Sequence, residues 1–394
     1  MTQTTPSKKK KKTPSINVSN TQQMKMPEDI DQTENMDNHF SIIQSTAEIS
    51  LRTQLDYSRQ GHALLRSFLP HALVQQLRSE LLPHAESHVI SAWRQKVEVQ
   101  LADSTDEYYK QNAQTIAKNL KSTEDCQDLL ESLGMDPLSG DLPFLQHSNT
   151  WRAHPAANIS NKSTTTATVR KVCLSPYLAQ AASILLNTST VRLYQDSLFH
   201  KRVGDGWTPW HSDARMAPFD TSKMITFWIP LQKVPAPDEG GTGLLFVDGS
   251  HSDFALPYWN GAVGKEYDRL ENRYGDGNSG GGVSHHMPMK LGDVTVHNGW
   301  TLHCADAAED MEDCEDRYAF SVTYVDGRAE VREDVLSSGV DNAKEREATN
   351  GSSPKGDRED VWSFRSWVEE VDPRIEFRHP LVPIVWPSKE RDIE

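Results

Sequence analysis

Two stretches decide how this chain is interpreted: Trp207-Thr208-Pro209-Trp210-His211-Ser212-Asp213 and Met224-Ile225-Thr226-Phe227-Trp228-Ile229-Pro230-Leu231. On extended backbone, side chains two residues apart point to one face, so His211 and Asp213 present an imidazole and a carboxylate together. The second stretch is almost wholly apolar, as in a strand that is buried on both faces. We therefore expect a polar pair with a core strand behind it.

An imidazole and a carboxylate are two thirds of the 2-His-1-carboxylate triad, which holds Fe(II) and leaves coordination positions open. A His-x-Asp triplet is weak evidence by itself, because the chain contains a second one, His251-Ser252-Asp253. Choosing between the two triplets requires a third ligand from a distant part of the chain.

The candidates for this third ligand are the histidines downstream of the core strand: His285, His286, His297 and His303. His297 lies within an expected strand, where an ordinary half-buried residue is the simpler interpretation. His285 and His286 follow a glycine run and are expected on a mobile segment. His303 follows the end of that strand, where a side chain can turn inward at the rim of the sheet. Geometry alone favours His303, with a structural histidine as the alternative.

Bulk composition limits the class of protein. The 394 residues are 36% hydrophobic and 25% charged, with a mean hydropathy of -0.63. No apolar run approaches the roughly 20 residues that cross a bilayer, and no secretory signal follows the N-terminal lysines. Four cysteines without a CxxC motif indicate a reducing compartment. We therefore expect an intracellular, cytoplasmic protein without a transmembrane segment.

The net charge of -15 argues against nucleic acid as a general partner. The run Lys8 to Lys12 is a local exception in a polar tail, and we interpret it as solvated and disordered. A nuclear address or a docking patch is the alternative.

The pattern along the chain predicts three parts. Residues 1–55 form a disordered polar tail, residues 56–330 form one domain, and residues 331–394 form a C-terminal extension that packs on it. A helix is expected over His71 to Leu82, closed by Pro83, and residues 85–135 are expected to form an outer helical layer.

Short strands and Gly/Pro-rich loops without βαβ alternation mark residues 190–326. They favour a mostly β fold with some α, namely a double-sheet jelly roll wrapped by N-terminal helices. Besides the core strand, we expect a helix at Tyr177–Leu186 and strands at Val191–Phe199, Leu244–Val247, Gly292–His297 and Tyr318–Val325.

The order of these motifs resembles the phytanoyl-CoA dioxygenase-like (PhyH-like) branch of the Fe(II)- and 2-oxoglutarate-dependent oxygenases. The matching segments are Gly61–Pro70, Val191–Lys201, Trp210–Asp213, Gly243–His251, and Gly292-Asp293 followed by His303 and Arg317. The resemblance covers roughly residues 56–330, and the ordered set is specific although each motif alone is weak. It implies a double-stranded β-helix, or cupin-like, core.

The resemblance also implies roles for individual residues. It assigns His211, Asp213 and His303 as iron ligands and leaves His251 and Asp253 a structural role in a turn. It matches Arg317 to the arginine that anchors 2-oxoglutarate, for which a planar, permanently charged group is suited. Ser197 and Trp228 are placed near this co-substrate by the same resemblance, with plain strand packing as their alternative.

Two departures from the family pattern stand out. The turn reads Asp248-Gly249-Ser250-His251, with Asp248 where the family usually has proline. An acidic insertion, Glu309–Asp313, lengthens the gap between His303 and Arg317. Because of that gap, Arg328 is kept as a second candidate for the anchor, and a surface salt bridge is the alternative role of Arg317.

By resemblance, the expected cofactors are Fe(II), 2-oxoglutarate and O2, with ascorbate as a supporting reductant. The expected reaction oxidises an unactivated C–H bond of a small-molecule or lipid-like substrate and releases succinate and CO2. Hydroxylation is the family's common outcome; ring closure or desaturation in a biosynthetic pathway are the other forms, and Asp213 argues against halogenation. Two rivals remain: a metal-dependent hydrolase that uses zinc, and a non-catalytic jelly-roll binding protein.

Overall fold

This structure, a computed structural model, describes residues 46–135, 145–153, 168–202, 208–253, 282–306, 316–332, 364–368, 370–372 and 378–387. The expected disordered tail up to residue 45, its Lys8–Lys12 run and the acidic segment Glu309–Asp313 lie outside the described residues. Most of the glycine run around residues 275–282 lies outside them too.

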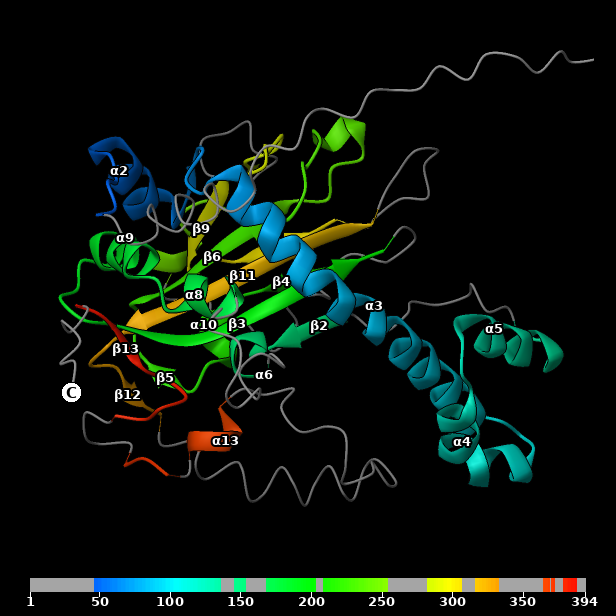
Figure 1. Ribbon diagram of the computed structural model, residues 1–394. Helices are drawn as coiled ribbons and strands as arrows, with labels where there is room; N and C mark the ends of the chain where they lie inside the picture. Colours follow the sequence, from blue (N-terminus) through cyan, green and yellow to red (C-terminus); the bar gives the residue numbers. More distant parts are fainter. Residues whose placement is uncertain are drawn as a thin grey trace, which may run out of the picture.

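A seven-stranded sheet, which we call the major sheet, forms the centre of the molecule (Figure 1). Its strand order is β1-β9-β6-β11-β3-β13, and β2 also pairs with β3. All of these pairs are antiparallel. Its strands are β1 (His62–Leu65), β2 (Leu145–Ser148), β3 (Val191–Lys201), β6 (Met224–Pro230), β9 (Val294–Asn298), β11 (Arg317–Asp326) and β13 (Ile384–Trp386).

A four-stranded sheet, the minor sheet, lies opposite one face of the major sheet. Its order is β4-β10-β7-β8, with strands β4 (Thr208–His211), β7 (Leu244–Val247), β8 (Val283–His285) and β10 (His303–Ala305). A third, two-stranded sheet pairs β5 (Phe219–Asp220) with β12 (Glu330–Val331). The two larger sheets enclose a core that includes Trp210, Trp228, Leu245, Cys304 and Ala319. The predicted jelly-roll fold is confirmed.

Alternation along β6 separates the two faces of the major sheet. Ile225, Phe227 and Ile229 belong to the main core on the helical side, whereas Trp228 packs in the core between the sheets. This is the period-2 pattern of a strand that is covered on both faces.

Cross-strand register aligns one polar row on the face that points toward the minor sheet. His62 is opposite His297, His297 is opposite Thr226, and Thr226 is opposite Thr323. Gln195 ends the row on β3, opposite Thr323. We call these five residues the polar row.

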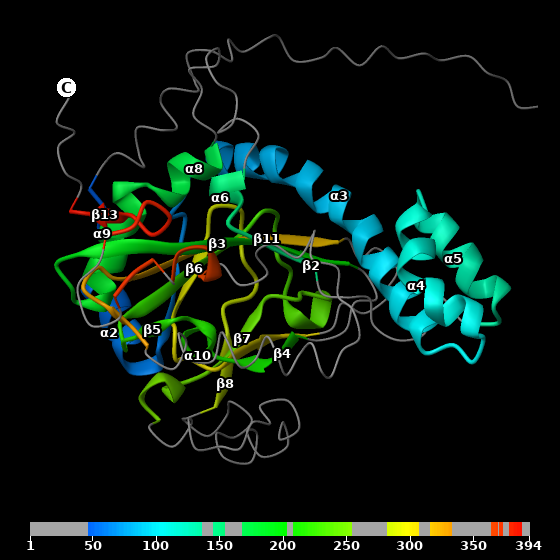
Figure 2. The same ribbon diagram turned by 90° about the horizontal axis from the view of Figure 1, so that it is seen from below.

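Helices cover the other face of the major sheet (Figures 1 and 2). They are α2 (Leu51–Gln60), the first half of α3 (His71–Ala102), α8 (Thr168–Cys173) and α9 (Pro176–Leu186), with the short α6 (Thr150–Ala153) beside α8. Helix α9 begins at a Ser175 N-cap before Pro176 and ends at Asn187 in the left-handed region. In the described part of the chain, every helix is too short or too polar to cross a membrane.

Helix α3 continues through Pro83, so the prediction that this proline ends the helix was wrong. Proline removes one backbone hydrogen bond, but here packing on both sides of it outweighs that loss. Leu77 and Leu81 are buried in the main core, whereas Trp93 and Val97 are buried against α4 (Glu107–Asn119) and α5 (Thr123–Ser132). The second half of α3, α4 and α5 thus form a helical arm beyond the sheets, as both views show (Figures 1 and 2).

Segments near the C-terminus contact the edge of the major sheet. Strand β13 pairs with β3, and Trp367 and Val368 of α13 (Arg365–Val368) pack with Phe219 in a separate core cluster. The division of the chain at residues 55 and 330 stays a prediction. The remaining elements are α10 (Asp213–Met216), η1 (Pro237–Glu239) and η2 (Ser250–Ser252).

Candidate metal centre

His211, Asp213 and His303 come together between the two sheets. One ligand atom from each lies within 4.8 Å of the others, and among the described residues this is the group of His, Cys, Asp or Glu side chains that could hold a metal ion. The Oδ1 atom of Asp213 lies 3.7 Å from Nε2 of His211 and 3.6 Å from Nε2 of His303. Two imidazoles and a carboxylate in this arrangement fit Fe(II).

Local structure explains how the two ligands of the triplet converge. His211 ends β4, and Asp213 begins α10 instead of continuing the strand. Ser212 between them has extended backbone (φ -124°, ψ 131°), so the two side chains still point the same way. The predicted convergence is therefore present, although the backbone turns at once after it.

His303 occupies a different element from the one expected. It is the first residue of β10, in the minor sheet, and lies directly opposite His211 in the register of β10 and β4. That pairing puts the centroids of the two rings 4.2 Å apart. The His303 Nδ1 lies 3.1 Å from the carbonyl oxygen of Thr301. With Nδ1–H donating there, Nε2 is left free to face a metal.

The electrostatics of the centre follow from its burial. Burial alone would raise the pKa of Asp213, but the neighbouring His303, His297 and His211 outweigh it and hold that pKa below its usual value. Burial, together with the charges of His211 and His297, lowers the pKa of His303 well below its usual value. The centre thus favours an ionised carboxylate beside a neutral imidazole, which are the forms that bind a metal.

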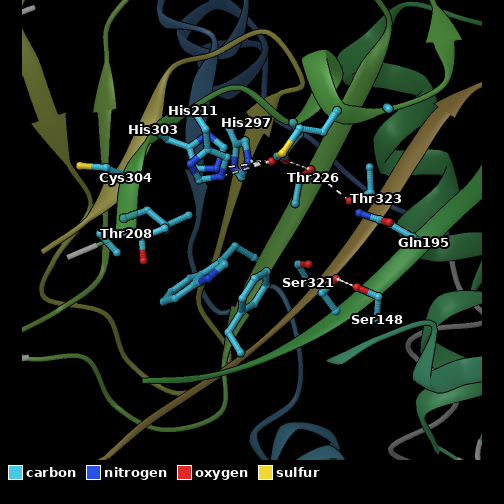
Figure 3. A pocket seen from close by; sticks show the side chains of 18 of the residues that line it. Ser148, Gln195, Thr208, His211, Thr226, His297, His303, Cys304, Ser321 and Thr323 are labelled. Carbon is cyan, nitrogen blue, oxygen red and sulfur yellow. Dashed lines mark hydrogen bonds and ion pairs between the residues drawn. The ribbon is translucent and has the colours of Figure 1, made fainter. Parts of the chain in front are cut away.

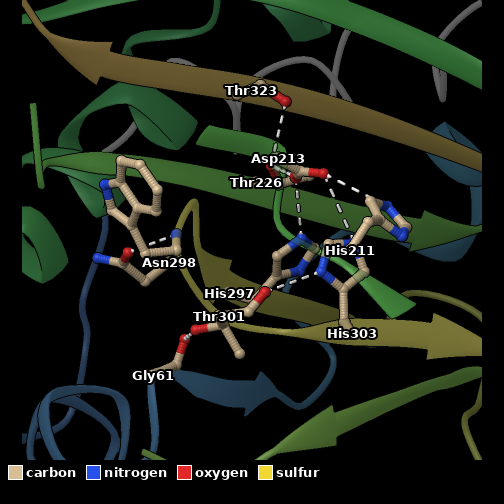
Figure 4. A network of polar contacts seen from close by, with 10 residues as sticks. Gly61, His211, Asp213, Thr226, His297, Asn298, Thr301, His303 and Thr323 are labelled. Atoms are coloured by element: carbon tan, nitrogen blue, oxygen red, sulfur yellow. Dashed lines mark hydrogen bonds and ion pairs between the residues drawn. The ribbon is translucent and has the colours of Figure 1, made fainter. Parts of the chain in front are cut away.

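His297 is the site residue that sequence reasoning missed. We expected a half-buried strand residue, but its side chain is only 1% exposed and its Nε2 lies 3.1 Å from Oδ2 of Asp213. Its ring centroid is 4.2 Å from that of His303. Figure 4 shows Asp213 between the three histidines on one side and the Thr226–Thr323 pair on the other.

The remaining candidates for a ligand lie elsewhere. His251 belongs to η2, and its Nδ1 is next to Gly61, so its predicted exclusion from the metal group agrees with the geometry. His285 ends β8, and the ring of His286 hydrogen-bonds His62 at 2.9 Å. Both histidines were expected on a mobile segment; the structure places His285 at the end of β8 and His286 directly after it.

Asp248, where the family usually has proline, belongs to this second polar cluster. Its Oδ1 lies 2.8 Å from Nε2 of His62 and accepts the Ser284 hydroxyl at 2.5 Å. The ring of His62 stacks on Phe246 with centroids 4.5 Å apart. Phe246 also contacts His297, so this cluster lies behind the metal centre and contributes no ligand to it.

A cavity of about 360 Å³ opens beside the three candidate ligands (Figure 3). It is lined by strands of both sheets, and all the residues assigned to the co-substrate reach it: Arg317, Trp228 and Ser197. The Ser197 hydroxyl is 3.0 Å from that of Ser148. A concave site of this size with a few convergent polar groups is typical for a small ligand.

Arg317 is buried at the start of β11, not on the surface as its alternative role required. It is 6% exposed, it donates from Nη1 to the carbonyl oxygen of Thr242, and no carboxylate among the described residues pairs with it. Burial lowers the pKa of Arg317 to about 10, so the group stays cationic at neutral pH. The second candidate, Arg328, is 58% exposed and lies 3.6 Å from Asp326, outside the cavity lining.

Comparison with models of protein families gave a match. The model of the family described as phytanoyl-CoA dioxygenase (PhyH) matches residues 57–309, more than half of the chain. A search of curated proteins found no match.

Solved structures with a similar fold include the non-heme alpha ketoglutarate dependent carbocyclase SnoK from nogalamycin biosynthesis. It is 18% identical, with 86% of this chain and 98% of that chain covered and a TM-score of 0.49. The epimerase SnoN from nogalamycin biosynthesis is 18% identical, with 85% and 97% covered and a TM-score of 0.47. EctD from S. alaskensis, crystallised with 2-oxoglutarate and 5-hydroxyectoine, is 14% identical, with 73% and 79% covered and a TM-score of 0.42.

Proposed function

The chain belongs to the phytanoyl-CoA dioxygenase family of iron(II)- and 2-oxoglutarate-dependent oxygenases, and we propose that His211, Asp213 and His303 hold its iron. One observation carries this proposal. The three candidate ligand atoms lie within 4.8 Å of one another, and they line the same cavity as a buried arginine that has no carboxylate partner among the described residues. An anion bound in the cavity would supply the partner that the described residues do not give this cation.

Arg317 would bind the far carboxylate of 2-oxoglutarate. A guanidinium presents a planar fork of donors that matches a carboxylate. The Nε atom of Arg317 is buried without a hydrogen-bond partner among the described residues, so the guanidinium keeps a donor that these residues leave unpaired. The Trp228 ring under the guanidinium would restrict its plane, and the hydroxyl of Ser197 would add a neutral hydrogen-bonding group to the same cavity.

When bound, iron(II) and 2-oxoglutarate supply the activation of O2 that removes a hydrogen atom from a substrate, with release of succinate and CO2. The residues of the chain would hold the ligand atoms in place and supply the cationic anchor. We propose hydroxylation of an unactivated C–H bond in a small-molecule or lipid-like substrate. The support is the carboxylate of Asp213 in the candidate ligand group and a cavity sized for a small molecule.

The test is turnover of 2-oxoglutarate by the full chain. The purified protein with Fe(II), ascorbate and O2 should form succinate, and pools of candidate metabolites should raise that rate when they contain the substrate. Absence of succinate with every pool, combined with tight retention of Zn(II), would favour the metal-dependent hydrolase instead. Absence of both would favour a non-catalytic binding protein.

A further inference from the structure

We propose that His297 and Thr226 are positioning residues that hold the second oxygen of Asp213, so that this carboxylate meets the metal through one oxygen only. The proposal rests on the proposed function, because it assigns the neighbours of a residue that we place among the iron ligands. It concerns two residues for which the sequence suggested only ordinary strand positions.

The two oxygens of Asp213 have different surroundings. Oδ2 accepts the Thr226 hydroxyl at 2.6 Å and lies 3.1 Å from Nε2 of His297. Oδ1 is the oxygen that lies near Nε2 of both His211 and His303, at 3.7 and 3.6 Å. An ionised carboxylate only accepts hydrogen bonds, so Thr226 and His297 both donate to Oδ2. The oxygen that faces the other two ligands is therefore Oδ1.

The direction of the hydrogen bonds continues into the sheet. Thr226 has a single hydroxyl proton and gives it to Asp213, so the 3.1 Å contact between Thr226 and Thr323 requires Thr323 as the donor. These side chains are neighbours because β9, β6 and β11 pair with His297 opposite Thr226 and Thr226 opposite Thr323. Three adjacent strands thus position one carboxylate oxygen.

The surroundings of His297 indicate that the polar function of its ring is to donate from Nε2 to Asp213. The ring is packed against the rings of His303 and Phe246, with centroids 4.2 and 5.6 Å away, where an apolar side chain of similar size would also fit. Its Nδ1 is buried without a hydrogen-bond partner among the described residues. Leaving that atom unpaired costs free energy, and the donation from Nε2 to Asp213 offsets this cost.

One-oxygen binding by Asp213 matters for the number of free positions. A carboxylate that bound through both oxygens would occupy a coordination position that the co-substrates require, since a 2-His-1-carboxylate centre works with open positions. Residues that orient a ligand from behind typically change metal affinity by about 10- to 100-fold when they are mutated. His297, Thr226 and Thr323 would raise the metal affinity by orienting Asp213, without touching the metal.

The experiment measures Co(II) binding to the full chain by calorimetry and records the visible absorption spectrum of the Co(II) form. Thr226→Val and His297→Phe keep the shape of the side chain and remove the donor. We expect both to bind Co(II) about 10- to 100-fold more weakly and to change the spectrum, because the carboxylate becomes free to bind through both oxygens. Thr226→Ser should restore the behaviour of the unmutated chain, and Thr323→Val should have a smaller effect than Thr226→Val.

The matched control is Thr295→Val on the same strand as His297. Thr295 is buried, and its hydroxyl has no partner among the described residues, so this change should leave affinity and spectrum as they were. Unchanged affinity and spectrum in Thr226→Val, with a normal melting temperature, would overturn the proposal even if His297→Phe failed to fold. If His211→Ala bound Co(II) as tightly as the unmutated chain, the metal centre itself would be misassigned and this inference would fall with it.

Discussion

The guanidinium carbon of Arg317 lies 5.4 Å from the centroid of the Trp228 ring. The cation comes from the start of β11 and the ring from the middle of β6, so the antiparallel pairing of the two strands creates the contact. A cation over an aromatic face is stabilised without losing its charge. An arginine that is buried in this way keeps its positive charge and can bind an anionic ligand.

Arg317→Ala should raise the 2-oxoglutarate concentration for half-maximal turnover by about 30-fold or more, because loss of one member of a buried charged pair costs about 2–5 kcal/mol. Arg317→Lys keeps the charge but loses the planar fork, so its effect should be intermediate. Succinate formation at a series of 2-oxoglutarate concentrations measures both. Arg328→Ala is the control, because Arg328 is exposed. If Arg328→Ala raises the 2-oxoglutarate concentration for half-maximal turnover and Arg317→Ala does not, Arg328 is the anchor.

His211→Ala should abolish iron binding, whereas His251→Ala should leave it largely intact. His211 contributes one of the three clustered ligand atoms, and His251 lies in η2, where burial lowers its pKa. Metal content after dialysis against Fe(II) under anaerobic conditions distinguishes the two variants. The reverse result would show that the ligand-bearing triplet is His251-Ser252-Asp253.

Gly61→Ala should lower stability by about 1–3 kcal/mol and weaken metal binding. Gly61 has a φ of +83°, and an added Cβ would overlap His251 and Thr301. The Gly61 carbonyl accepts the Thr301 hydroxyl at 2.8 Å, and the Thr301 carbonyl is the partner of the His303 ring. A shift at residue 61 is therefore transmitted to a candidate iron ligand.

Gly134→Ala is the matched control for that change. Gly134 also has a positive φ, +73°, but an added Cβ would meet nothing within 4 Å. The Gly134→Ala change should lower the free energy of unfolding through backbone strain alone and leave metal affinity unchanged. Urea unfolding and a Ni(II) titration on both variants measure the two effects. Equal loss of metal affinity in both variants would contradict the proposed link through Thr301.

Acid should destabilise the fold through His286. Burial, followed by the charges of His62 and Arg66, lowers the pKa of His286 from 6.5 to about 3. Below pH 6.5 the unfolded chain takes up a proton that the folded chain refuses, so stability falls as the pH drops toward 3. The slope from this residue is at most about 1.4 kcal/mol per pH unit.

His286→Gln should therefore flatten the dependence of unfolding free energy on pH between about 6 and 4. His285→Gln is the comparison, because His285 is the exposed neighbour of His286. Urea unfolding at several pH values gives both curves. If the curves of the two variants run parallel, His286 is not the group that resists protonation.

The sequence allowed the jelly-roll core and most strands to be predicted, because a strand with two covered faces has a near-continuous apolar run, as in Met224–Pro230. Helix α3 was predicted too short, because the rule that proline ends a helix is local and the packing of Trp93 and Val97 beyond it is not. The helical character of residues 85–135 was predicted, but no local pattern indicates that one helix runs through Pro83 into that arm.

The candidate ligands could be placed from motif order, but their neighbours could not. His297 contacts Asp213 only because β9 pairs with β6 in one particular register, and no pattern within β9 reports that register. Likewise, His303 was expected at the rim of a sheet, whereas its position opposite His211 depends on the order of strands in the minor sheet. Such relationships arise between strands that are far apart in sequence.

The polar row across five strands also bears on how the chain reaches its native state. A strand that pairs one residue out of step presents its opposite side chains, so a slip of β9 or β6 would turn His297 or Thr226 away from Asp213. Only the correctly paired sheet would then hold the carboxylate of Asp213 in place among the candidate metal ligands. A metal that binds the native chain and not its misaligned forms adds its binding free energy to the native state alone. Iron in this position would thus favour correct strand pairing during folding, in addition to its part in the reaction.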